Sequence, residues 1–173
     1  MSGHVTLAPW IVWDGDIASH HSYAVVNCEI TQALISQGIG VEILGGAGYG
    51  RSPGGAPRPL AYVRHRWPPD FSRPDLASFE GVRFVVIQPW EYGYLPLSWI
   101  QPLRDQVDEV WAYSEFVRQV YTQSGIDGQR VHVIGCGINP ARFRPGLKPA
   151  NLPTQKGFRF LFVGGAATSR KGL

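Results

Sequence analysis

Short apolar runs alternate along this chain with segments of helical periodicity, and this alternation constrains the fold more than any other feature. Strands are expected at 4–12, 41–44, 61–64, 82–87, 109–113 and 131–134. The run at 82–87 is β-branched and nearly all apolar, which suits a strand that is covered on both faces. The pattern therefore predicts an α/β protein with a doubly wound, mostly parallel, Rossmann-like sheet.

Two helices are predicted from their ends. A helix over 22–37 is expected to end in a left-handed conformation at Gly38. A later helix is expected to have Ser114 as its N-cap and to stop at Gly125. The apolar positions of the first helix are Val25, Val26, Ile30, Ala33 and Leu34.

Proline and glycine predict where regular structure is interrupted. The segment 45–59 is dominated by both residues and should be a loop. The segment 65–78 contains three prolines, so a regular helix is excluded there. A helix over 96–107 is expected to break near Pro102, because proline has no N–H for the helical hydrogen bond.

Charge and cysteine usage exclude several classes of protein. The net charge is only +3, and Lys and Arg are interspersed, so no nucleic-acid partner is expected. Cys28 and Cys136 have no metal-ligand spacing and are expected to be buried or half-buried thiols. The start lacks the features of a signal peptide, and no run approaches the ~20 apolar residues of a membrane span. We therefore expect a cytoplasmic protein.

The order of the elements predicts two domains. Residues 1–145 are expected to form the Rossmann-like domain and 146–157, rich in Pro, Asn and Gly, a linker. The segment 158–173 has the pattern of a buried strand at 158–163 that leads into a Gly and Arg-Lys loop, as at the start of a second doubly wound domain. One strand cannot bury itself, so we expect more polypeptide to follow Leu173.

Several segments in this order resemble a known family. They are 110–118, 124–126, 131–139 and 143–145, which read VWAYSEFVR, SGI, VHVIGCGIN and FRP, followed by FVG at 162–164 and RKG at 170–172. Their combination resembles the retaining glycosyltransferases of family four, which have the GT-B fold. The resemblance covers 5–173 and implies the N-terminal, acceptor-side half of that fold and the start of the donor-side half.

The resemblance implies where a donor diphosphate binds. Cations and backbone N–H groups at a helix start favour phosphate. The resemblance assigns this contact to Lys171 and Arg170, next to Gly164 and Gly165. Gly15, in the loop after the first strand, permits close backbone approach at the same cleft and is also a diphosphate-binding candidate.

The sequence departs from the family at three points. Gly135-Cys136-Gly137 replaces Pro-Asn-Gly, and Gly165 stands where many members have an arginine. The family's Glu-x7-Glu segment, which binds the donor sugar and ribose, does not occur in these 173 residues. Donor identity and the catalytic residues therefore stay open.

Five residues are candidates for contact with the acceptor, each with a structural alternative. They are Asp16, His20, His65, Trp67 and Glu91. Asp16 could instead be a capping or solvated acid, and Glu91 a capping or salt-bridged acid. His20 could be an ordinary surface histidine, and His65 and Trp67 could be buried by packing. Adjacent His20 and His21 point in different directions and lack a third ligand, so no metal site is predicted.

The resemblance implies sugar transfer from a nucleotide-sugar donor to a glycan, lipid-linked or other hydroxyl acceptor, with retention. The resemblance implies that neither a metal nor another cofactor is needed. Two alternatives stay open: a non-catalytic GT-B-like module that binds a glycan or a partner protein, and a Rossmann-type domain with unrelated chemistry. The aromatic residues at 90–99 leave open a peripheral contact with the inner membrane face, and the 173-residue chain alone is expected to be inactive.

Overall fold

The computed structural model describes residues 9–44, 58–74, 81–148, 151, 153–158 and 160. The chain divides into two units, Met1–Gly137 and Ile138–Leu173. All helices and strands among the described residues belong to the first unit. The expected division at 145, 146–157 and 158 stays a prediction, because much of the second unit lies outside the described residues.

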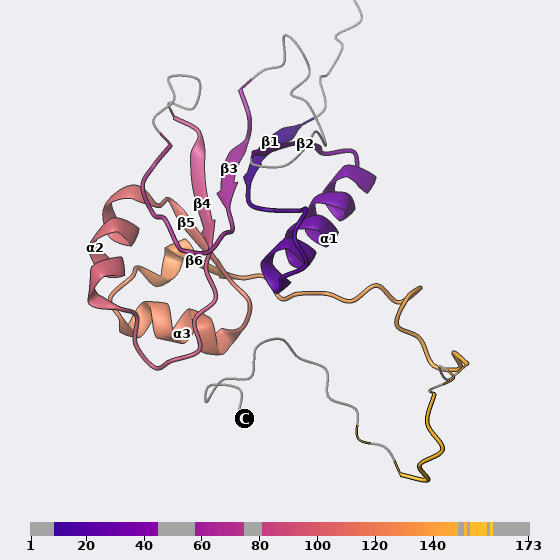
Figure 1. Cartoon of the computed structure of the whole chain (residues 1–173). Coiled ribbons are helices and arrows are strands. Elements are labelled where there is room, and N and C mark those ends of the chain that lie inside the picture. The colour runs from indigo at the N-terminus through magenta and orange to yellow at the C-terminus, as the bar shows by residue number, and fades with distance from the viewer. Residues whose placement is uncertain are drawn as a thin grey trace, which may run out of the picture. The chain divides into compact units, whose positions relative to one another are not determined.

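The first unit is built on a six-stranded sheet in which every neighbouring pair is parallel (Figure 1). The strand order is β2-β1-β3-β4-β5-β6. The strands are β1 (Trp10–Asp14), β2 (Gly40–Leu44), β3 (Ala61–Arg64), β4 (Arg83–Ile87), β5 (Glu109–Ala112) and β6 (Val131–Val133). This architecture confirms the predicted doubly wound, Rossmann-like α/β fold.

Helices cover both faces of the sheet (Figure 1). On one face, α1 (Ser22–Ser36) packs against alternate strand residues such as Ile11 and Trp13. On the other face, α2 (Leu97–Gln106) and α3 (Glu115–Gln123) pack against the intervening positions, such as Val12. The side chains of one strand thus point alternately into two cores, as the period of two requires.

The predicted helix ends are confirmed. Gly38 and Gly125 have φ of 80° and 86°, the left-handed region that glycine enters without steric cost. Ser114 is the N-cap of α3, and its hydroxyl accepts a hydrogen bond of 3.3 Å from the amide of Val117. Local sequence is sufficient to place these boundaries because each depends on one residue and its near neighbours.

The buried face of α1 differs from the expected apolar face. The buried residues are Ala24, Asn27 and Thr31, whereas Val25 is 52% exposed. Thr31 satisfies its hydroxyl by donating to the carbonyl of Asn27 at 2.8 Å. The inner face of α1 therefore carries polar groups, which are buried because each finds a hydrogen-bond partner.

The expected break at Pro102 is wrong. The helix α2 runs without interruption from Leu97 to Gln106 with Pro102 inside it. The proline removes the hydrogen bond to the carbonyl of the residue four positions earlier, and its ring crowds that carbonyl. Its neighbour Leu103 is fully buried, and Arg130 donates to the carbonyls of Leu103 and Arg104 at 3.0 and 3.1 Å, so tertiary contacts hold this part of the helix.

Three other expectations differ in part. The first strand covers Trp10–Asp14 rather than 4–12, of which 4–8 lie outside the described residues. Phe158 and Phe160 are 75% and 93% exposed and belong to no strand, so the expected buried strand is not formed at these two positions. Cys136 is exposed rather than buried, whereas Cys28 is half-buried.

Candidate functional site

The order of the strands defines one point at which ligands bind in open parallel sheets. From β1 the chain passes to β2 on one side and then to β3 on the other, so the order reverses between β1 and β3. In such sheets the crevice lies outside the carboxyl ends of the strands at this reversal. The carboxyl ends here are Asp14 and Arg64, which are direct neighbours in the β1–β3 register.

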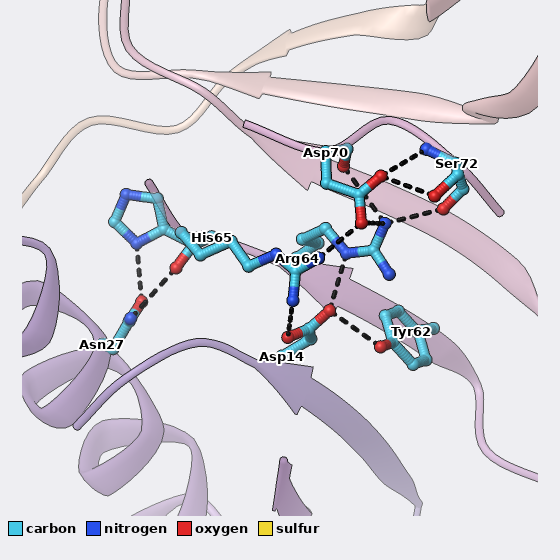
Figure 2. A network of polar contacts seen from close by, with 8 residues as sticks. Asp14, Asn27, Tyr62, Arg64, His65, Asp70 and Ser72 are labelled. Atoms are coloured by element: carbon cyan, nitrogen blue, oxygen red, sulfur yellow. Dashed lines mark hydrogen bonds and ion pairs between the residues drawn. The ribbon is translucent and has the colours of Figure 1, made fainter. Parts of the chain in front are cut away.

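A charged network lies at this edge (Figure 2). It is on the face covered by α2 and α3, to which Val12 and Tyr62 of the same strands also point. The carboxylate of Asp14 accepts hydrogen bonds from Arg64 Nε at 2.6 Å and from the Tyr62 hydroxyl at 2.8 Å. All three residues are buried. Burial, with a further contribution from the Asp14 carboxylate, raises the pKa of Tyr62 to about 12, so the phenol stays protonated.

The guanidinium group of Arg64 also forms hydrogen bonds with the segment after β3 (Figure 2). Arg64 Nη1 donates to the carbonyls of Asp70 and Ser72 at 3.1 and 2.6 Å and lies 3.1 Å from the Asp70 carboxylate. Half-exposed Arg66 pairs with Asp70 and more weakly, at 3.4 Å, with Asp14. Burial opposes ionisation of Asp70, but hydrogen bonds from Ser72 and the two guanidinium charges outweigh it and lower its pKa.

A second network, without formal charge, lies on the face covered by α1. Its centre is Asn27, which is fully buried on α1. The amide oxygen of Asn27 lies 3.1 Å from Trp13 Nε1 and 2.6 Å from His65 Nδ1. Its amide nitrogen donates to the carbonyls of Asp16 and His65 at 2.8 and 3.1 Å. One side chain thus joins β1, the loop after it and the end of β3.

His65 is enclosed by this network. The ring is 1% exposed and stacks on Tyr23 of α1 with 4.5 Å between the centroids. Its Nε2 lies 3.0 Å from the hydroxyl of Tyr113, at the end of β5. Burial lowers the pKa of His65 to about 4, so the imidazole is neutral at physiological pH. The ring therefore contacts other residues of this chain at both nitrogens.

Gly15 and Asp16, both predicted site residues, lie at the same edge. A Cβ atom on Gly15 would stand 2.5 Å from Asn27 Nδ2 and 2.6 Å from the carbonyl oxygen of His65. The Asp16 carboxylate accepts from the amides of Ala18 and Ser19 at 2.8 and 3.3 Å. A hydrogen bond from the Ser19 side chain, together with these two backbone hydrogen bonds and the charge of His21, lowers the pKa of Asp16 to about 2. Asp16 is a loop acid and not the cap of α1, because the N-cap of that helix is His21.

The other predicted acceptor residues are more exposed. His20 is exposed in the loop before α1, and Trp67 is 62% exposed shortly after β3. Glu91 is exposed in the loop after β4, and its charge acts on Tyr23, which packs against His65. Buried packing thus describes His65 but not Trp67. The structure brings Gly15, Asp16 and His65 together through Asn27.

The four remaining donor-site candidates cannot be compared with the structure. Lys171, Arg170, Gly164 and Gly165 lie outside the described residues. Residues 45–57 of the predicted loop at 45–59 lie outside them as well.

Sequence reasoning missed the residues that organise the edge, namely Asn27, Arg64 and Tyr113. A signal existed for one of them: Asn27 is a polar residue within the otherwise apolar pattern of the first helix, and a buried polar residue needs a specific partner. No local signal identifies Arg64 as the partner of Asp14, because fifty positions separate them. Tyr113 lies within the family-like segment but at a position to which no role was assigned.

None of the described helices is long and apolar enough to cross a membrane. Within the same described part of the chain, no three His, Cys, Asp or Glu side chains form a group that could hold a metal ion. That the activity needs no metal stays a prediction.

The fold and the position of the polar edge define an α/β protein with a Rossmann-like, doubly wound parallel sheet and a candidate site at its β1–β3 reversal. No protein-family model, curated protein or solved structure matches the chain. The resemblance to family-four glycosyltransferases therefore rests on the sequence segments quoted above.

Proposed function

We propose that this chain is the acceptor-side part of a retaining GT-B glycosyltransferase, which transfers a sugar from a nucleotide-sugar donor to a hydroxyl acceptor. The observation that carries the proposal is the polar edge at the β1–β3 reversal of a fully parallel sheet. Ligands of doubly wound proteins bind at this point. Since many chemistries share this fold, the family-like segments at 110–145 supply the choice of reaction.

The chemistry divides between the two halves of such an enzyme. The acceptor hydroxyl has to be held near the anomeric carbon, while the leaving diphosphate is stabilised as its charge develops. In this proposal Glu91 and the exposed Trp67 contact the acceptor, and the cations Arg170 and Lys171 contact the diphosphate. Asn27 holds the loop after β1 and the end of β3 in position through its hydrogen bonds. The reaction takes place in the cytoplasm, and a lipid-linked acceptor would bring the protein to the inner membrane face.

Expression of the complete reading frame that contains this chain tests the proposal. We expect release of a nucleoside diphosphate from a UDP-, GDP- or ADP-sugar when acceptor is present, and a product with the anomeric configuration of the donor by NMR. Lys171→Ala should lower kcat/KM by about 100-fold, because a cation that stabilises transition-state charge is worth roughly 3 kcal/mol. The exposed Lys148→Ala serves as the matched control and should change little.

A folded full-length protein that releases no nucleoside diphosphate from any of these donors contradicts the proposal. The reading frame itself gives an independent check, since a second doubly wound domain with a Glu-x7-Glu segment is expected after codon 173. If the reading frame lacks that segment, the proposed sugar transfer is wrong for this protein.

One observation favours a second function, a non-catalytic module that binds a glycan or a partner protein. The carboxylates of Asp14 and Asp16 and the ring of His65 all contact groups of this chain, as structural residues do. Saturable binding of a glycan by the full-length protein, with no turnover of any nucleotide sugar, is the result that would select this alternative.

A further inference from the structure

The orientation of the Asn27 side-chain amide is fixed by four neighbours. The two partners of its nitrogen, the carbonyl oxygens of Asp16 and His65, are acceptors only. The indole N–H of Trp13, which points at its oxygen, is a donor only. A rotated amide would set its NH₂ group against the indole N–H and its oxygen against both carbonyls. The amide oxygen therefore faces Trp13 and His65.

This orientation determines which nitrogen of His65 carries the proton. Since the amide oxygen of Asn27 can only accept, His65 Nδ1, at 2.6 Å, has to be the donor. Burial keeps the ring neutral, so Nε2 has a lone pair and no hydrogen. The hydroxyl of Tyr113, 3.0 Å from Nε2, then donates its proton to this nitrogen. Burial also raises the pKa of Tyr113, so that proton is retained.

We infer that Asn27 is a positioning residue that sets the hydrogen-bond polarity of the sheet edge: it holds His65 as the Nδ1–H tautomer and thereby leaves the oxygen of Tyr113 as an acceptor toward any further partner. The same hydroxyl also interacts with the side chain of Cys136, a thiol whose pKa is raised by burial and which carries a weak S–H donor. A group with an O–H or N–H bond fits at this point, and a phosphate oxygen does not. That the group is an acceptor-substrate hydroxyl rests on the proposed function, whereas the polarity does not.

The tautomer is measurable by NMR on the whole chain labelled with ¹⁵N-histidine. Long-range ¹H–¹⁵N correlations show which ring nitrogen is protonated, and the signal of His65, one of five histidines, is the one missing in His65→Gln. For the wild type at pH 6 we expect a proton on Nδ1 and none on Nε2. A proton on Nε2 alone, or on both nitrogens, overturns the inference.

Two variants separate the role of Asn27 from that of Tyr113. Tyr113→Phe should leave the Nδ1–H tautomer unchanged, because Asn27 is still present. Asn27→Asp puts a carboxylate against the ring, so His65 should be doubly protonated at pH 6, close to the ordinary histidine pKa. The other titratable rings that contact His65 are Tyr23 and Tyr113, and both have raised pKa values and are neutral at this pH.

A change to Nε2–H in Tyr113→Phe overturns the inference, because Tyr113 and not Asn27 would then set the tautomer. A neutral His65 in folded Asn27→Asp overturns it as well. If Asn27→Asp does not fold, the spectra of the wild type and Tyr113→Phe still decide. None of these measurements involves sugar transfer, so their failure is distinct from failure of the proposed function.

Discussion

Two networks start from adjacent residues, the last residue of β3 and the one after it, and they accommodate buried polar groups in different ways. Arg64 points to the α2–α3 face and joins a network of ions with Asp14 and Asp70. The next residue, His65, points to the α1 face and joins a neutral network around Asn27. Both lie at the carboxyl edge of the same sheet.

The difference lies in what each network requires to remain buried. A buried ion is tolerated only while its counter-ion is present, so the Arg64 network depends on complete pairing. The neutral network depends instead on the direction of each hydrogen bond, because its donors and acceptors are matched one to one. We therefore expect the two networks to fail under different perturbations: the first on loss of a charge, the second on a change of protonation.

The largest loss of stability is expected in the ionic network around Arg64. Arg64→Ala leaves Asp14 buried without its main counter-ion and should lower the free energy of unfolding by about 3–5 kcal/mol. Urea denaturation measures this change. Arg66→Ala removes a half-exposed guanidinium group that pairs with Asp14 and Asp70. It should lower the free energy of unfolding by less than about 1 kcal/mol. Equal losses in the two variants would show that burial does not distinguish the two arginines.

For the neutral network around Asn27 and His65, the corresponding perturbation is a change of pH. The pKa of His65 is about 4 in the folded state and near 6.5 when unfolded, so the unfolded chain binds a proton first. Stability should therefore fall by about 3 kcal/mol as pH drops from 6.5 to 4. Asp16 and Asp70, whose pKa values are lowered, lose their contribution only as the pH falls below about 4.

Urea titrations at half-unit pH steps measure this slope. His65→Gln should remove most of it, whereas the exposed His20→Gln should keep it. A wild-type stability that stays constant between pH 6.5 and 4 contradicts the buried, neutral state of His65.

The close packing around Asn27 in the neutral network is tested at Gly15. Gly15→Ala places a methyl group 2.5 Å from Asn27 Nδ2 and 2.6 Å from a backbone oxygen, and overpacking of this kind should cost about 2 kcal/mol. Gly93→Ala, where the added methyl meets nothing within 4 Å, is the matched control and should be near neutral. Thermal unfolding compares the two variants, and equal melting temperatures would refute the close packing at Gly15.

The smallest difference is expected between two tyrosine hydroxyls. Tyr62 donates to the carboxylate of Asp14, and Tyr121 donates to the carbonyl of Gln88, both at 2.8 Å. Hydrogen bonds to charged groups are the stronger ones. Tyr62→Phe should therefore destabilise the protein by about 1 kcal/mol more than Tyr121→Phe, as measured by urea denaturation. The reverse order would mean that the charge of Asp14 is satisfied by Arg64 alone.

The parts of the fold that depend on local sequence were predictable. Ala61–Arg64 is found as expected, and Gly38 and Ser114 end and begin their helices as predicted. The continuity of α2 through Pro102 was not, because tertiary contacts from Arg130 and a buried leucine outweigh one missing hydrogen bond.

The candidate site was predictable in its location but not in its contacts. Alternation of strands and helices places Gly15 and His65 at the same sheet edge, where the structure has them. Asn27 lies eleven positions from Asp16 and thirty-eight from His65, and a single sequence carries no sign of these hydrogen bonds. Their partners follow only from the three-dimensional register of β1, β3 and α1.

The interior place of β1, between β2 and β3, has a consequence for how the protein is made. Among the described strands β1 leaves the ribosome first, and β2 can pair with one of its edges once residue 44 has emerged. The other edge stays open until β3, some twenty residues later, arrives. During that interval Asp14 has no Arg64, so its carboxylate stays hydrated, and the nascent chain exposes one strand edge of the kind that chaperones protect.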